Sequence, residues 1–268
     1  MEPETFSKLA GPDGSLAEGD MRKALDADVP ASRKRLLPHV ASHLDSLATL
    51  FDLIDEPHRA AGELLAAWIA EHYRPGEPLG VVVVCTGNSR RSILGSTMGN
   101  VAAVYCGMPE VRFYSGGTAP TAFNPRTVAT LKEIGVEIES TGEEAKRGEP
   151  KIANPIYRVR WGRGESETEP AFEAVEFSKL FSDASNPKKG FAALMVCSEA
   201  DAGCPFVPGS SLRVSMPYLD PKLFDDSPDE AEKYRECRDD IGRLLLSVMI
   251  QARHRGPQPS EKHRDGRP

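Results

Sequence analysis

One short segment, residues 81–92, contains residue types that together could bind an oxyanion and attack it. A run of four valines ends at Cys85, so the sequence predicts a buried strand that delivers a thiol to the start of a loop. Gly87 in this loop permits backbone conformations that other residues rarely adopt, and a predicted helix over residues 92–106 follows. Backbone N–H groups of such a loop and of a helix N-terminus can converge on one anion.

A permanent positive charge stands at the end of this loop, at Arg91. Its guanidinium can bind two oxygens of one anion, and such surroundings favour the thiolate, the nucleophilic form of cysteine. A second Cys-x5-Arg spacing, Cys106 to Arg112, encloses a proline and a glutamate and would repel an oxyanion. The nucleophile is therefore predicted at Cys85, and Cys106 is predicted to be a packing residue.

The segment Cys85–Ser92, with Ser115–Thr118 and Asp220-Pro221, resembles the low-molecular-weight protein tyrosine phosphatase superfamily over roughly residues 79–250. The resemblance implies a three-layer α/β sandwich with a parallel sheet flanked by helices. It implies that the cysteine attacks the substrate, that the arginine binds the transition state, and that Asp220 is the general acid. The residues expected to bind substrate are Thr86, Gly87, Asn88, Ser89, Arg90, Arg91 and Ser92. Those expected to support the loop are Asn88, Ser92 and Ser115.

Two more thiols occur in the segment Cys197–Cys204, and a proline follows them. This Cys-x6-Cys-Pro pattern resembles the redox segment of thioredoxin-coupled arsenate reductases. The resemblance implies that Cys85 attacks arsenate, that Cys197 attacks Cys85 and releases arsenite, and that Cys204 then attacks Cys197. Thioredoxin would reduce the final disulfide, and Gly203 would help the segment to loop out. No other cofactor is expected. The structural alternative is a core cysteine at 197 and a loop thiol at 204.

Three functions remain open. A thioredoxin-coupled arsenate reductase is favoured, because Lys222-Leu223-Phe224 follow Asp220-Pro221 where phosphotyrosine phosphatases usually carry two tyrosines. The second is a low-molecular-weight protein tyrosine phosphatase, which would act on phosphotyrosine proteins through a phosphocysteine intermediate. The third is a non-catalytic module that binds anions or serves as a scaffold.

The composition argues against several classes of partner and location. A net charge of −7 argues against nucleic acid and against an anionic membrane surface. An odd number of cysteines and an N-terminus without a basic or apolar run favour a cytoplasmic location. The six histidines lie outside the predicted catalytic part, which argues against a cysteine–histidine hydrolase. His39 and His43 stand four apart but lack a third ligand, so no metal site is expected. Some relatives bind potassium through an acidic residue about eleven positions after the nucleophile; Ser96 stands there, which argues against that site.

The chain divides into three predicted parts. Residues 1–78 comprise a disordered segment to about residue 30 and a helical hairpin of residues 33–55 and 58–73. We expect this extension to pack on the catalytic domain; dimerisation or regulation through its helices is the alternative. Residues 79–253 form the catalytic domain, and residues 254–268 a disordered tail.

The catalytic domain alternates between strands and helices, which predicts a parallel sheet with flanking helices. The strands are expected at 80–85, 111–115, 136–138 and 191–197. The helices are expected at 92–106, at 125–134 with Asn124 as its cap and Gly135 as its stop, and from a capping box at Ser227 to about residue 252, where Cys237 is a packing residue. Residues 140–190 are predicted to be an insertion with a β-hairpin, 156–161 and 172–177. Arg158 and Arg160 of this hairpin are expected on a solvated face.

Overall fold

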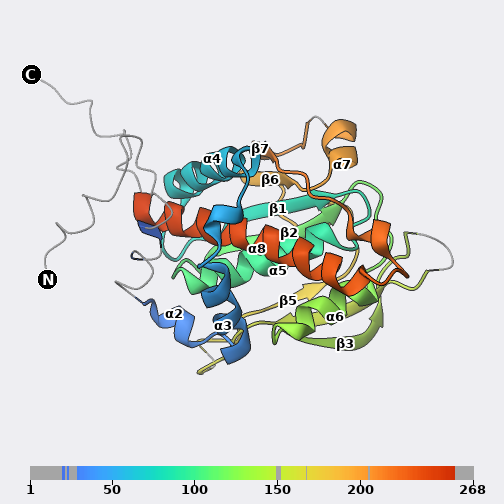
Figure 1. The fold of residues 1–268 in the computed structure, drawn as a ribbon, viewed down its shortest axis with the longest axis horizontal. Coiled ribbons are helices and arrows are strands. Elements are labelled where there is room, and N and C mark those ends of the chain that lie inside the picture. The colour runs from blue at the N-terminus through green and yellow to red at the C-terminus, as the bar shows by residue number, and fades with distance from the viewer. Residues whose placement is uncertain are drawn as a thin grey trace, which may run out of the picture.

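The computed structural model describes residues 20–21, 23, 29–148, 152–166, 168–204 and 206–256. The fold is α/β, with a parallel sheet of four strands flanked by helices, which confirms the predicted fold class (Figure 1). The predicted disorder at the two ends concerns residues that lie almost entirely outside this description; residues 254 and 255 belong to the last helix.

The parallel sheet has the strand order β2-β1-β6-β7. Its strands are β1 (Leu79–Cys85), β2 (Val111–Gly117), β6 (Phe191–Met195) and β7 (Ser210–Ser215). The first three confirm predicted strands, whereas β7 was not predicted. Strand β1 lies between two neighbours and is buried on both faces, which agrees with the four consecutive valines at its centre. The loop after β1 therefore opens at the carboxyl edge of the sheet, where parallel sheets bind ligands.

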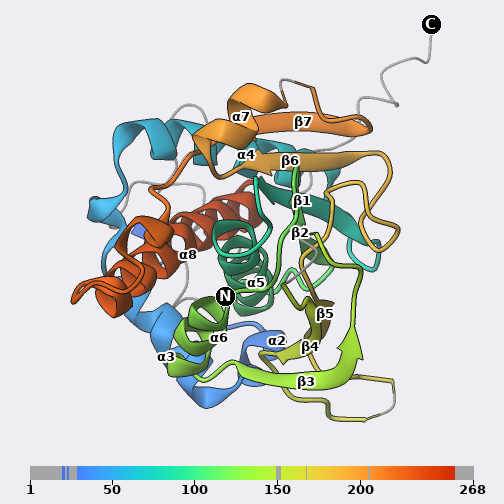
Figure 2. The same ribbon diagram turned by 90° about the vertical axis from the view of Figure 1, so that its right-hand side faces the viewer.

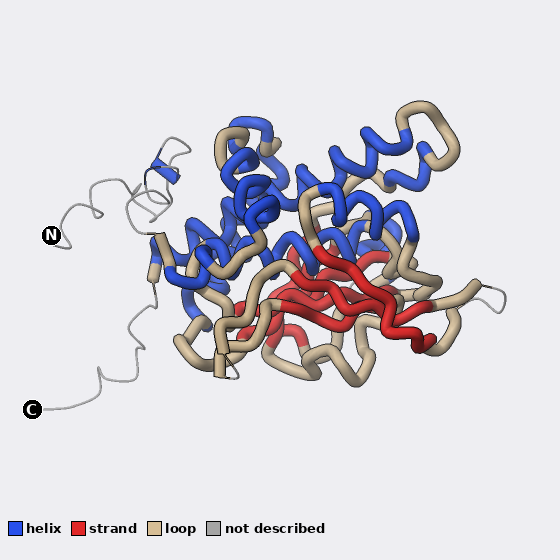
Figure 3. The backbone as a smooth tube through the Cα atoms, turned by 90° about the horizontal axis from the view of Figure 1, so that it is seen from below, coloured by secondary structure: helices blue, strands red, loops and turns tan. Residues whose placement is uncertain are grey.

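Different parts of the chain cover the two faces of this sheet: helices lie on one side of the strands and mainly loops on the other (Figure 3). Helix α5 (Arg91–Tyr105) packs on the face of Val83, where a Cβ on Gly95 would lie only 2.8 Å from the valine side chain. On the opposite face, a Cβ on Gly116 would lie 2.4 Å from the Cα of Phe181. The end of the predicted insertion is thus packed against the sheet itself, and the two glycines make both close approaches possible.

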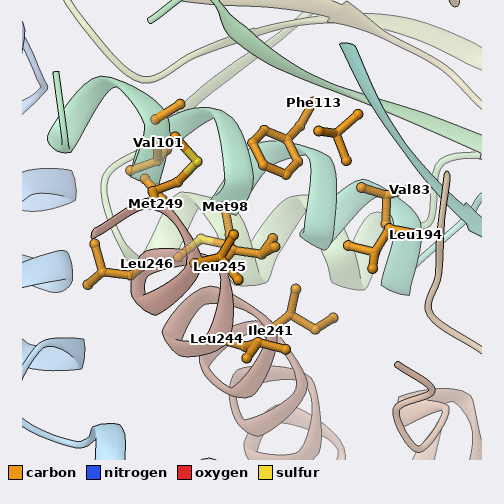
Figure 4. Close-up of a cluster of buried hydrophobic side chains, with 14 of the residues drawn as sticks. Val83, Met98, Val101, Phe113, Leu194, Ile241, Leu244, Leu245, Leu246 and Met249 are labelled. Atoms are coloured by element: carbon orange, nitrogen blue, oxygen red, sulfur yellow. The ribbon is translucent and has the colours of Figure 1, made fainter. Parts of the chain in front are cut away.

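The long helix α8 (Glu230–Arg255) lies across α5 and joins the N-terminal helices to the core (Figures 1 and 2). Figure 4 shows Leu245 of α8 beside Met98 of α5, and Met249 beside Val101. A Cβ on Gly242 would come within 2.6 Å of Met98, so the helices meet closely at this position. Cys237 on the same helix is buried, which confirms it as a packing residue.

The predicted helical hairpin is wrong. In place of one helix over 33–55 the chain forms α2 (Ala31–Lys34), α3 (Pro38–Leu47) and the 3-10 turn η2 (Phe51–Leu53). The break has a local cause, because a residue before proline disfavours helical dihedrals, and Leu37 is extended at φ −62°, ψ 138°. The second helix, α4 (Glu56–His72), forms as predicted. Helices α3 and α4 lie on opposite sides of α8 and both pack against it (Figure 2).

A second sheet is antiparallel, with the order β3-β4-β5. Its strands are β3 (Glu137–Glu144), β4 (Pro155–Arg160) and β5 (Glu173–Glu176). The predicted hairpin is confirmed as β4 and β5. The predicted strand at 136–138 forms, but its placement in the parallel sheet was wrong, because it pairs with β4. Arg160 bridges the glutamates Glu137 and Glu173 of the two outer strands, so it lies on a strand face as expected.

Helix α6 (Pro125–Glu133) has the predicted Asn124 cap, and Gly135 ends it at φ 89°. Helix α8 begins at Glu230, later than predicted, and the predicted capping box does not form. Glu230 Oε2 accepts from the N–H of Asp226, and Ser227 Oγ accepts from the N–H of Asp229. Two short helices escaped prediction, α7 (Ser198–Gly203) and the 3-10 turn η3 (Pro221–Phe224). No described helix has both the length and the apolar character that a membrane span requires.

Candidate active site

Cys85 is the last residue of β1, and its side chain is 4% exposed. The loop that follows is tightly held, because neighbouring segments donate hydrogen bonds to two of its backbone carbonyls. Thr121 N–H and the Ser178 hydroxyl donate to the carbonyl of Gly87, at 3.0 and 2.9 Å. Asn124 N–H and the Thr127 hydroxyl donate to the carbonyl of Ser89, both at 3.2 Å. Protein donors thus satisfy these carbonyls, and the loop N–H groups remain available to an anion.

A chain of side-chain hydrogen bonds leads to the sulfur. Asn88 Nδ2 donates to Ser92 Oγ at 2.8 Å, and Ser92 Oγ lies 3.1 Å from Cys85 Sγ. Because the serine oxygen already accepts from Asn88, its own proton is available to point at the sulfur. Such a donor stabilises a thiolate. Asn88 has φ 42°, in the left-handed region that asparagine tolerates better than most residues.

The guanidinium of Arg91 lies beside the segment that carries the predicted general acid. Arg91 Nη2 is 2.6 Å from Asp220 Oδ2, and Arg91 Nη1 donates to the carbonyl of Tyr218 at 2.8 Å. Asp220 also caps η3 by accepting from Lys222 N–H. The structure therefore brings Cys85, Arg91 and Asp220 to one place.

These groups line one open cavity of about 430 Å³ at the carboxyl edge of the sheet. Its lining includes most of the predicted substrate-binding residues and adds Lys222 and Glu199, which sequence reasoning missed as site residues. The pKa of Glu199 is lowered, first by a hydrogen bond from its own backbone N–H and further by the charge of Arg91 and the thiol of Cys197. The sequence did offer one sign that Glu199 belongs to the site, because it lies two positions after Cys197 in the redox segment. The predicted residues in the lining are Cys85, Thr86, Gly87, Ser89, Arg90, Arg91 and Asp220.

Arg90 lines the cavity, but its guanidinium is bound by two other side chains. Its Nε donates to Tyr234 Oη and its Nη2 to Asp225 Oδ2, at 2.5 and 2.9 Å. Ser115, predicted to support the loop, lies behind it: its hydroxyl donates to Glu176 instead of to a loop residue.

The thiol of Cys197 lies next to the carboxyl end of β1. The register of β1 and β6 pairs Val84 with Met195, so the chain places Cys197 level with Thr86, and the Thr86 hydroxyl is 3.4 Å from Cys197 Sγ. Cys197 is fully buried and caps α7, with its sulfur accepting from Ala200 N–H at 3.4 Å. Cys204 follows α7, is partly exposed, and donates its thiol proton to the carbonyl of Phe206.

The other two cysteines are packing residues, as predicted. Cys106 is completely buried, and burial raises the pKa of its thiol to about 12. Burial likewise raises the pKa of Cys237 well above its ordinary value. Both thiols are therefore neutral and unreactive near pH 7. Among the residues that the structure describes, no group of three His, Cys, Asp or Glu side chains is arranged to hold a metal ion.

No protein-family model and no curated protein matches the chain. Among solved structures, it resembles the thioredoxin-dependent arsenate reductase Cg_ArsC1' of Corynebacterium glutamicum, with 16% sequence identity and a TM-score of 0.35. The match covers 86% of this chain and 83% of the other. A likeness of this size does not identify an activity.

Proposed function

We propose that the protein is an arsenate reductase that uses a cysteine nucleophile and a thiol relay ending in a disulfide that thioredoxin reduces. One observation carries the proposal: two adjacent parallel strands, β1 and β6, end side by side, and each delivers a buried cysteine to the same edge of the sheet. A phosphatase needs a single thiol, that of Cys85, whereas a reductase also needs a second thiol that can attack it. The relay requires reduced thiols, so we place it in the cytoplasm.

In the first step, the Cys85 thiolate attacks the arsenic of arsenate. An S–As bond forms and one As–O bond breaks, and Asp220 supplies the proton with which that oxygen leaves as water. Arg91 binds two of the remaining oxygens, and the loop N–H groups bind the third. Arsenic remains As(V) in this adduct.

In the second step, the Cys197 thiolate attacks Cys85 Sγ. The S–As bond breaks, its electron pair stays on arsenic, and arsenite is released as As(III) while the two sulfurs become a disulfide. Parallel strands lie about 4.8 Å apart, but Cys197 is level with Thr86, one residue beyond Cys85, so a shift of the loop must bring the two sulfurs together.

In the third step, Cys204 attacks Cys197 Sγ and sets Cys85 free. Helix α7 separates these two thiols, and seven residues at the helical rise place their Cα atoms roughly 10 Å apart. A disulfide allows at most about 7 Å, so α7 must unwind. The new disulfide is then near the surface, where the dithiol of thioredoxin supplies the two electrons that restore the enzyme.

The test is arsenate reduction with thioredoxin, its reductase and NADPH, compared with hydrolysis of an aryl phosphate. Serine variants of Cys85, Cys197 and Cys204 are measured beside wild type. We expect the Cys85 variant to lose both activities. The Cys197 variant should lose all arsenate reduction, the Cys204 variant should lose only multiple-turnover arsenate reduction, and both should keep aryl phosphate hydrolysis. Reduction of arsenate without Cys197 would overturn the relay. Inactivity of the reduced wild-type protein towards both substrates would favour the anion-binding scaffold.

A second observation favours the phosphatase alternative. A cavity of about 460 Å³ adjoins the first one and shares Ser89, Arg90, Thr121 and Lys222 with it. Its far end is apolar and includes Phe123 and Tyr157, whose rings are 5.1 Å apart in an edge-to-face arrangement. Arsenate has no group to fill such a space, whereas a phosphate monoester of an aromatic alcohol does.

This alternative is tested with 2-naphthyl phosphate, whose ring system is large enough to reach the second cavity. If it is a substrate, Tyr157→Ala should raise KM about ten-fold for the naphthyl ester and leave the KM for arsenate unchanged. Val175→Ala, at an exposed position of the same sheet, is the matched control. An equal KM for the naphthyl ester in both variants would remove the support that this cavity gives to the phosphatase.

A further inference from the structure

A lysine and a glutamate are buried together behind the Cys85 loop. The side chains of Lys179 and Glu176 are 4% and 5% exposed, and Lys179 Nζ lies 3.2 Å from Glu176 Oε2. Charged side chains are rarely buried so completely, because taking them out of water is costly unless they are paired. Neither takes part in the three chemical steps proposed above, so their burial calls for another explanation.

The carboxylate of Glu176 binds three donors from three parts of the molecule. Ser115 of β2 donates to Oε2 at 2.7 Å, and Ser96 of α5 donates to Oε1 at 3.2 Å. The third donor is the ammonium of Lys179. The pair therefore ties the end of β5 to the strand beside β1 and to the helix that follows the nucleophile loop.

The backbone of Lys179 reaches the loop itself. Its N–H donates to Asn88 Oδ1 at 2.8 Å, and its carbonyl accepts from Gly117 N–H at 2.9 Å. The amide of Asn88 is thereby oriented, with its oxygen towards Lys179 and its nitrogen towards Ser92, whose hydroxyl faces the sulfur. A continuous set of contacts runs from the buried ion pair to Cys85.

We propose that Lys179 and Glu176 are positioning residues for the nucleophile: their ion pair fixes the backbone of residues 176–179, which holds Asn88 and Ser92 in the orientation that stabilises the Cys85 thiolate. The proposal deepens the proposed function but applies equally to a reductase and a phosphatase. The segment that the sequence marked as an insertion is, in its last residues, part of the active site.

The first experiment removes the charge from the lysine and follows the reactivity of Cys85 with iodoacetamide as a function of pH, by mass spectrometry of the Cys85 peptide. Alkylation needs no turnover, so this result is independent of whether the protein reduces arsenate. In Lys179→Met we expect the midpoint of the alkylation profile to move up by about one pH unit. The charged groups that line the cavity, Arg90, Arg91, Glu199, Asp220 and Lys222, are the same in both proteins.

The matched control is Lys188→Met. Lys188 lies in the same connecting segment and donates to the carbonyls of Ser182 and Asp183, but it is exposed and its ammonium does not contact Glu176. We expect its alkylation profile to coincide with that of wild type. A Lys179→Met profile that also coincides with wild type, in a protein that remains folded by circular dichroism, would overturn the proposal.

The second experiment separates positioning from simple loss of structure. Lys179→Ala should lower kcat for an aryl phosphate about 30-fold with KM changed less than three-fold, and ethylammonium should restore at least a third of the lost kcat. Tetramethylammonium at the same ionic strength should not, because it cannot donate hydrogen bonds. Adding Glu176→Ala should abolish rescue, since the carboxylate that binds the added cation is gone. Rescue that persists in this double variant would contradict the assigned role.

Discussion

The two ends of the proposed thiol relay lie in contrasting surroundings. The loop at Cys85 is held by hydrogen bonds from residues 121–127 and 178–179, and its key side chains are buried. The segment from Cys197 to Cys204 contains the six-residue helix α7, whose C-terminal residues are exposed. It is held mainly by Arg213 of β7, which donates to the carbonyls of Asp201 and Cys204. The difference matches two tasks. Oxyanion chemistry needs fixed donors, whereas passing a disulfide outwards needs a segment that can open.

The largest difference between the two regions is expected when the arginine of each is exchanged for lysine. Arg91→Lys should lower kcat/KM for both arsenate and aryl phosphate by about 100- to 1,000-fold, because an ammonium cannot bind two oxygens in the plane of a guanidinium. Arg213→Lys should leave aryl phosphate hydrolysis within two-fold of wild type. Steady-state kinetics on both substrates checks this. Comparable losses of phosphatase activity in the two variants would show that the regions are not separable.

A smaller effect is expected from the asparagine that fixes the loop. Asn88→Ala leaves the buried Lys179 N–H without an acceptor and puts alanine at φ 42°, so we expect a loss of about 2–4 kcal/mol in the free energy of unfolding. The kcat should fall about 10- to 100-fold. Asn88→Gly accepts the backbone angle but restores no hydrogen bond, so its kcat should fall equally while its stability falls less. Urea unfolding and kinetics of both variants distinguish strain from lost orientation; equal stability of the two would exclude the strain.

The contrast between regions also explains what the sequence could reveal. The Cys85 loop was predictable because its requirements are local: a valine run, a glycine, an arginine six positions on and a helix start all lie within residues 81–92. Asp220 was predictable only through its motif, since nothing local fixes its distance from Arg91. The break at Leu37 was also local, and the rule for residues before proline would have revealed it.

The rest depended on long-range pairing. Glu176 ends strand β5 and Lys179 lies just after it, in a region whose alternating polarity is typical of a solvated hairpin. Their burial depends on residues some sixty positions earlier: Gly116 leaves room for Phe181, and the backbone of Gly117 pairs with Leu180. Strand β7 was missed for a similar reason: its residues Ser210–Ser215 are mostly polar and form a strand because β6 offers an open edge.

The mobility of the second region can be adjusted without touching a thiol. Ala202→Gly, at an exposed position of α7, should weaken this helix by about 1 kcal/mol and speed formation of the Cys197–Cys204 disulfide about five-fold. Diamide oxidation in a Cys85→Ser background measures that step alone. Ala67→Gly makes the same change at an exposed position of α4. If both variants form the disulfide at the wild-type rate, opening of α7 does not limit the step.

The smallest expected effect concerns Glu199, the one residue of α7 that lines the Cys85 cavity. Its pKa is held below the ordinary value of 4.5, first by its own backbone N–H, so it is ionised at neutral pH and repels an oxyanion. Glu199→Gln should therefore lower KM for arsenate about two- to three-fold at pH 7, a small effect because the side chain is exposed. The charge is lost only as pH falls through the lowered pKa, so the difference between variant and wild type should persist down to about pH 4.5 and disappear below it. Glu71→Gln, on an exposed part of α4, should show no difference at any pH. An unchanged KM in Glu199→Gln would mean that α7 influences the first region only through its thiol.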